Sequence, residues 1–235
     1  MNKRVSRTIF VSGAAAAVIA LGATAAFATT ATWSISPKGN FTSSLSSGTT
    51  TTLTDTTTGI TLTCTVSASD GTVPKAGSGL SGKGIATITS TTFGTSSTLC
   101  TGPAGSKFTA VGTNTPWKLN ATKYKASVDG GQTTGTITAK GTGVGGKITG
   151  TVIGVNCSAT LGGTTSAPAK ANGLYDNGSH TLAITSVTNL KVLTSTCPDV
   201  NVGDVSTFVT APASKAGSPV SHGYSVSPAL QITSP

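Results

Sequence analysis

The fold class is indicated most clearly by the stretch LTCTVSASDG (62–71), which is followed by GIATITSTTF (84–93) and STLC (97–100). These pieces are rich in Thr, Ser and β-branched residues and poor in residues that favour helices. Many short strands separated by frequent turns are typical of sandwiches and barrels. We therefore expect an all-β fold, either a disulfide-stabilised β-sandwich or a partly open barrel.

A second set of stretches repeats this order later in the chain: VNCSATLGGT (155–164), TLAITSVTNL (181–190) and TSTC (194–197). Ile88 and Ile184 stand at similar distances from their flanking cysteines. This spacing favours a diverged duplication, with modules 33–123 and 124–223 and a closing terminal strand 224–235. Chance similarity between Thr- and Ser-rich strands is the alternative.

The individual strands are expected where β-branched residues gather, at 49–54, 60–66, 84–93, 107–111, 117–121, 133–139, 147–155, 180–187, 190–195 and 205–210. Turns are expected at the steps Asp70-Gly71, Asp129-Gly130, Gly145-Gly146, Gly162-Gly163 and Asn177-Gly178.

Four cysteines, Cys64, Cys100, Cys157 and Cys197, remain for structural roles. An even count in an exported chain predicts two disulfides, and no CxxC spacing suggests zinc. Of the three possible pairings, the repeat favours Cys64–Cys100 and Cys157–Cys197, which tie each module to itself.

The first 28 residues are typical of a signal peptide. A basic segment, MNKRVSRT, precedes an apolar run, and Ala26-Phe27-Ala28 forms a small-x-small cleavage site. We expect 1–28 to be removed and 29–235 to be a secreted domain without membrane attachment.

The charged residues of 29–235 are unusual. This part has no Glu, Arg or Met, its six acids are all Asp, and its twelve basic residues are all Lys, so its formal net charge is +6. Without Arg it lacks bidentate contacts to guanine or phosphate, and we expect no nucleic-acid binding. Lysine charges attract anionic polymers at long range.

Candidate catalytic groups are few. The stretch YDNGSH (175–180) brings Asp176, Ser179 and His180 close in sequence, but neighbours in a tight turn rarely converge as a triad does. No GxSxG motif occurs, and no Glu is present for a glycosidase pair. We expect no enzymatic activity and no cofactor.

Metal and nucleotide motifs are also incomplete. In CPDVNVGD (197–204), Asp199, Asn201 and Asp204 offer oxygen ligands, but no Glu closes a calcium loop, so we expect a solvated turn and no metal. The stretches GSGLSGKG (77–84) and GTGVGGKI (141–148) have the spacing of phosphate loops but lead into strands, and they predict hairpin turns.

The most distinctive surface candidate is PWKLNATKYK (116–125). Aromatic rings stack on sugars, and Lys attracts phosphate or carboxylate. The candidate binding residues are Trp117, Lys118, Asn120, Lys123, Tyr124 and Lys125. Alternation of Trp117 with Leu119 also fits a core strand that directs its lysines outward.

Both ends of the secreted part carry one pattern: aromatic, Ser, β-branched, Ser, Pro, at 33–37 and 224–228. We expect Trp33, Ile35, Tyr224 and Val226 to be buried in strands at or near the sheet margins, where Pro is tolerated.

Several stretches resemble a group of secreted actinobacterial all-β proteins without an established activity: CTGPAGSKFTA (100–110), PWKLNATKY (116–124), TTGTITAKGTG (133–143), NCSATLGG (156–163) and YSVSPALQITSP (224–235). The resemblance implies export and a β-rich fold, and it assigns no catalytic residue.

The sequence therefore predicts an exported, non-catalytic structural or binding protein of the cell envelope or extracellular space. Its expected partner is an anionic cell-wall polymer or a saccharide, held weakly. The alternatives are a hydrolase of cell-wall polymer and a carrier of an apolar small molecule, which a dry interior cavity would favour.

Overall fold

The computed structural model describes residues 32–128, 130–152 and 154–235. Within these ranges the structure consists of strands and one short 3-10 turn, η1 (Pro103–Gly105). The same ranges contain no helix that is long and apolar enough to cross a membrane. The predicted all-β class is confirmed, whereas the predicted signal peptide, 1–28, lies outside the described residues.

Eight antiparallel strands form a closed barrel, here called the first ring. In order of pairing they are β7 (Ala86–Phe93), β10 (Trp117–Lys125), β11 (Gln132–Thr138), β14 (Lys170–Asp176), β15 (Thr181–Thr188), β18 (Tyr224–Ser227), β2 (Gly39–Leu45) and β5 (Ser67–Val73). The ring closes because β7 pairs with β5 on one edge and with β10 on the other, where Trp117 lies opposite Ile88.

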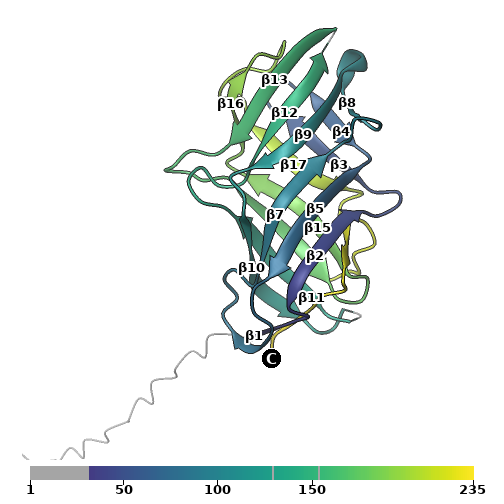
Figure 1. Cartoon of the computed structure of the whole chain (residues 1–235), viewed down its shortest axis with the longest axis vertical. Coiled ribbons are helices and arrows are strands. Elements are labelled where there is room, and N and C mark those ends of the chain that lie inside the picture. The colour runs from purple at the N-terminus through teal and green to yellow at the C-terminus, as the bar shows by residue number, and fades with distance from the viewer. Residues whose placement is uncertain (1–31, 129, 153) are drawn as a thin grey trace, which may run out of the picture. The chain divides into compact units, whose positions relative to one another are not determined.

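Eight further strands form a second ring. In order of pairing they are β17 (Ser206–Ala211), β3 (Thr50–Asp55), β4 (Thr61–Cys64), β8 (Cys100–Thr101), β9 (Lys107–Thr113), β12 (Gly145–Val152), β13 (Val155–Gly162) and β16 (Lys191–Ser195). Its two ends meet at an isolated bridge between Lys191 and Val205, next to a 2.9 Å hydrogen bond from Ser206 N–H to the Leu190 carbonyl. The rings join where β9 pairs with the end of β7, and Figure 1 shows β9, β12 and β13 above β2, β10 and β11.

The chain alternates between the two rings. After β2 in the first ring, β3 and β4 join the second; β5 and β7 return to the first; and the pairs β8–β9, β10–β11, β12–β13, β14–β15 and β16–β17 continue this alternation until β18. Each of the modules expected from the sequence therefore supplies strands to both rings.

The matching end motifs form strands that pair on both edges. β1 (Trp33–Ser36) lies between β19 (Gln231–Thr233) and β6 (Gly77–Leu80) in a separate three-stranded sheet, and β18 lies between β15 and β2. Burial of Trp33, Ile35, Tyr224 and Val226 is confirmed, since each is at most 7% exposed. The expected place at or near the sheet margins is wrong for β18, which has a partner on both sides within the closed first ring, whereas β1 is the middle strand of a small sheet and lies next to both of its margins. In both strands pairing ends at the Ser before the proline, so the proline does not interrupt the ladders.

Both predicted disulfides are present, and each joins neighbouring strands of the second ring. Cys64–Cys100 lies beside Thr63 and Thr101, the one paired position of the β4–β8 ladder. Cys157–Cys197 continues the β13–β16 ladder, with Cα atoms 4.8 Å apart. The disulfides therefore reinforce the wall of the second ring at two places.

Two expected turns are wrong, because the Gly residues lie inside strands. Asp70-Gly71 falls within β5, where the ladder to β7 shifts register, and Gly145-Gly146 begins β12. A Cβ at Gly71 would overlap the Phe41 ring. Glycine at this position therefore provides space for a buried aromatic side chain rather than a chain reversal.

Candidate functional site

The candidate residues of β10 fall on two opposite faces of the strand. Lys118, Lys123 and Lys125 are exposed, whereas Trp117 and Tyr124 pack against the hydrophobic core. The ladder to β11 shifts register between Ala121 and Lys123. One extra residue at such a shift changes the alternation of faces, which keeps all three lysines on the outer surface. We call this outer set the lysine face.

Neither aromatic ring is available to stack on a sugar at the lysine face. The Trp117 indole N–H donates a 2.7 Å hydrogen bond to the Thr113 carbonyl, and its ring points inward. Tyr124 packs over the backbone of Gly131, where a Cβ would collide with the phenol ring. The structure therefore separates the aromatic candidates from the lysines.

Asn120 has a structural role in the wall of the first ring. Its Oδ1 accepts a 2.9 Å hydrogen bond from the Gly84 N–H, and its Nδ2 donates to the Thr138 hydroxyl at 3.0 Å. The Ala121 N–H also donates to the Gly82 carbonyl. These contacts fasten the 81–84 turn to β10, so the amide is occupied within the fold.

The side chains considered for hydrolysis stabilise a turn. The Asp176 carboxylate accepts hydrogen bonds from the N–H groups of Gly178, Ser179 and Val220 at 2.9 to 3.1 Å. The Ser179 hydroxyl donates to the Val220 carbonyl at 2.6 Å. Asp176 and Ser179 thus bind backbone groups and do not orient the ring of His180.

The oxygen ligands considered for calcium do not converge either. Asp204 Oδ2 accepts a hydrogen bond from the Asn201 N–H at 2.8 Å, which closes a local turn, and Asp199 is exposed. Across the described ranges, no three His, Cys, Asp or Glu side chains are grouped as a metal site requires.

The structure reveals a feature that the sequence did not: an inner cavity of about 100 Å³ where the two rings meet. Its walls are almost wholly apolar. They come from both rings and include Phe93, Phe108, Trp117, Ile148, Leu161 and Phe208.

An outer cavity of about 270 Å³ lies within the second ring, next to the inner one. The two cavities share five lining residues: Leu53, Leu62, Phe108, Ile148 and Leu161. The exposed residues Pro103, Ala104 and Asp199 also line the outer cavity, so it reaches the surface between the 102–106 and 197–204 loops.

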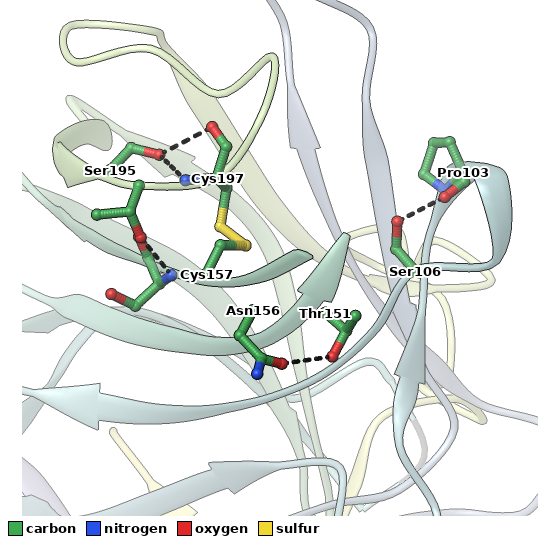
Figure 2. Close-up of a disulfide and its surroundings, with 9 residues drawn as sticks. Pro103, Ser106, Thr151, Asn156, Cys157, Ser195 and Cys197 are labelled. Atoms are coloured by element: carbon green, nitrogen blue, oxygen red, sulfur yellow. Dashed lines mark hydrogen bonds between the residues drawn. A yellow bond between two sulfur atoms is a disulfide. The ribbon is translucent and has the colours of Figure 1, made fainter. Parts of the chain in front are cut away.

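The rim of the outer cavity is fixed by covalent and hydrogen bonds. Figure 2 shows the Cys157–Cys197 disulfide together with the turn at Pro103 and Ser106, and all four residues line the cavity. The Ser106 hydroxyl donates to the Pro103 carbonyl at 2.6 Å, and the Cys197 N–H donates to Ser195 Oγ at 3.0 Å. These contacts hold the two rim loops in place.

One strand, β3, brings polar atoms to these apolar cavities. Thr51, Leu53 and Asp55 alternate along it and therefore face the same side. Thr51 lines the inner cavity, Asp55 lines the outer one, and Leu53 lines both. Thr51 Oγ1 and Asp55 Oδ2 are buried without a hydrogen-bond partner among the described residues.

A scan against models of protein families and searches of curated proteins and of solved structures return no match to this chain.

Proposed function

We propose that this chain is an exported, non-catalytic protein that binds an apolar small molecule in two adjoining cavities, one within the second ring and one where the two rings meet. The observation that carries the proposal is the pair of adjoining apolar cavities, of about 100 and 270 Å³. Small-molecule sites are concave and mostly apolar, with a few polar groups that fix orientation. The cavities have this character, and Thr51 and Asp55 each contribute a buried oxygen that has no hydrogen-bond partner among the described residues.

The size of the cavities favours a small ligand. An engineered apolar cavity of about 150 Å³ stays dry and binds benzene. The inner cavity is smaller than that and would hold one end of a molecule, whereas the outer cavity would hold its larger part. The shared residues Leu53, Phe108 and Leu161 would contact its middle.

The disulfides support export. Disulfides form and persist in oxidising compartments, and both disulfides reinforce the second ring, which contains the outer cavity and forms part of the wall of the inner one. A cross-linked wall would keep a binding cavity open outside the cell without a bound partner.

A titration with n-octanol tests the proposal. Trp117 lines the inner cavity and Trp33 does not, so a Trp33→Phe background makes emission report on the cavity. At a concentration one hundred times the Kd, binding should stabilise the fold by about 2.7 kcal/mol, measurable as a rise in melting temperature. Absence of both signals would contradict the proposal.

A cavity-filling variant provides the matched test. Gly146 lines the inner cavity, and the atom nearest to a Cβ there is the Val111 carbonyl oxygen at 3.5 Å. Gly146→Leu should occupy the cavity and abolish octanol binding while the protein stays folded. Thr149→Leu, on the exposed face of the same strand, is the control and should bind as the parent does. Equal binding by both variants would place the ligand elsewhere.

A second proposal rests on the lysine face. The register shift in β10 presents Lys118, Lys123 and Lys125 on one exposed surface, and 29–235 carries a formal charge of +6. We propose weak association of this face with anionic envelope polymers. Such attraction should weaken with salt, since the Debye length falls from about 10 Å at 0.1 M to about 3 Å at 1 M.

Sedimentation with purified cell walls at low and high salt tests this second proposal. The parent should bind at low salt only, and a triple Lys→Gln variant of the lysine face should not bind. Binding that the variant retains would reject the lysine face as the contact.

A further inference from the structure

We propose, on the basis of the function proposed above, that the bound molecule carries a cationic amine and that Asp55 receives it. Asp55 ends β3, is 6% exposed, and lines the outer cavity. The ligand class is then an apolar body with an ammonium group. The apolar body would contact the apolar walls of the cavities, and the ammonium group would contact the Asp55 carboxylate.

The two oxygens of Asp55 have different environments. Oδ1 accepts hydrogen bonds from the N–H groups of Thr57 at 2.8 Å and Thr58 at 3.1 Å, which stabilise the turn between β3 and β4. Oδ2 is buried and makes no hydrogen bond within the described structure. The turn therefore needs one carboxylate oxygen and leaves the other unpaired.

An unpaired buried carboxylate oxygen is costly, because burial removes the water that would solvate it. Across the described ranges, no Lys or His lines either cavity, so the walls supply no cation to Asp55. An ammonium group offers three donors and forms short, charge-assisted hydrogen bonds with carboxylates. A ligand amine would therefore supply the partner that the fold lacks.

The negative charge of the outer cavity also disfavours anionic ligands. Asp199 lines the rim of the outer cavity, so a second carboxylate stands on the path to Asp55. A carboxylic acid with the same apolar body would meet two like charges. Fatty acids and other apolar anions should bind worst.

The geometry also orients the ligand. With a rise of about 3.3 Å per strand residue, Thr51 lies about 13 Å from Asp55 along β3. An ammonium at Asp55 would direct the apolar body past Leu53 toward the inner cavity. Emission from Trp117 should then respond to the far end of the molecule.

Three matched probes test the inference on the full secreted chain: n-octylammonium, n-octanol and n-octanoate. Hydrogen bonds to charged groups contribute more than neutral ones, and we expect octylammonium to bind at least about tenfold more tightly than octanol. Octanoate should bind most weakly. Calorimetry at neutral pH measures all three affinities.

Asp55→Asn is the decisive variant, because an amide oxygen can still accept from Thr57 and Thr58 while the charge is removed. Its affinity for octylammonium should fall to that for octanol, and its affinity for octanol should not change. Asp70→Asn is the control: it removes the same charge from an exposed position in the first ring and should not change the affinity for any probe. Asp199→Asn separates attraction at the rim from direct pairing at Asp55.

The outcomes distinguish two claims: that the cavities bind an apolar molecule, and that Asp55 binds its ammonium group. Equal binding of the three probes would overturn the amine assignment and leave apolar binding standing, whereas no binding of any probe would overturn both. A preference for ammonium that survives Asp55→Asn would overturn the role of Asp55. If that variant fails to fold, equal affinities of the parent for octylammonium and octanol would overturn the inference.

Discussion

Removing the Cys64–Cys100 disulfide should destabilise the protein globally and also open one seam of the second ring. The perturbation is the double substitution Cys64→Ala and Cys100→Ala, with Cys157→Ala and Cys197→Ala as the matched comparison. Both pairs bridge adjacent strands, and their sequence separations are 36 and 40 residues. The chain-entropy model assigns each closed loop about 4 kcal/mol of stabilisation.

For a domain of this size, 1 kcal/mol corresponds to roughly 2–4 °C in melting temperature, so each double variant should melt about 8–16 °C lower. The local effects should differ. The β4–β8 ladder has one paired position, Thr63 with Thr101, whereas the β13–β16 ladder has four. Loss of Cys64–Cys100 therefore leaves a seam with almost no backbone pairing.

Calorimetry and amide hydrogen exchange test both parts of this reasoning. Exchange in β4 and β8 should accelerate beyond the global change in the Cys64/Cys100 variant, while β13 and β16 should follow the global stability in the other. If the melting temperature decreased by less than about 3 °C, the estimate of stabilisation by loop closure would be refuted. Equal local exchange in the two variants would refute the seam argument.

Three further predictions concern the first ring. A chain ending at Gly223 loses β18, so β15 and β2 become open edges, and light scattering should show aggregation; a stable monomer would contradict this. Burial raises the pKa of the Tyr224 and Tyr175 hydroxyls above the usual value of about 10. Because the unfolded phenols ionise first, stability to denaturant should fall as pH rises above about 10, with a smaller slope when both residues are replaced by Phe. Gly71→Ala should cost about 1–3 kcal/mol, because a Cβ there would overlap both the Phe41 ring and the Thr87 carbonyl oxygen; Phe41→Leu should recover only the part that is due to the ring, as measured by chemical denaturation.

The sequence predicted strands well where β-branched residues gather and poorly where the interior is polar. In β5, Ser67 and Ser69 are buried; Ser67 donates to the Thr92 carbonyl at 2.7 Å, and Ser69 to the Thr91 hydroxyl at 2.8 Å. Because hydrogen bonds satisfy these hydroxyls, an inward face can be polar, and the alternation of hydrophobicity that identifies a strand disappears. The strands β2 and β14, which contain Ser or an Asn-Gly step, escaped prediction for related reasons.

The candidate site was harder to predict than the fold. The composition of β10 indicated aromatic and basic residues, but the register shift that sends them to opposite faces leaves no mark in the sequence. The cavities are assembled from many strands, and each contributes one or two ordinary apolar residues. In the sequence, Asp55 is typical of a turn residue. Only the structure shows that it is buried beside a cavity and that one of its oxygens has no partner among the described residues.

The alternation of the chain between the two rings has a kinetic consequence. Neither ring can close early, because the second requires β16 and β17 and the first requires β18. Folding should therefore depend on contacts between residues far apart in sequence, which is slow in β proteins of high contact order. Until residues 191–227 have been synthesised, the two rings cannot both close. Unpaired strand edges should therefore stay exposed, and the chain should remain accessible to proteases and chaperones.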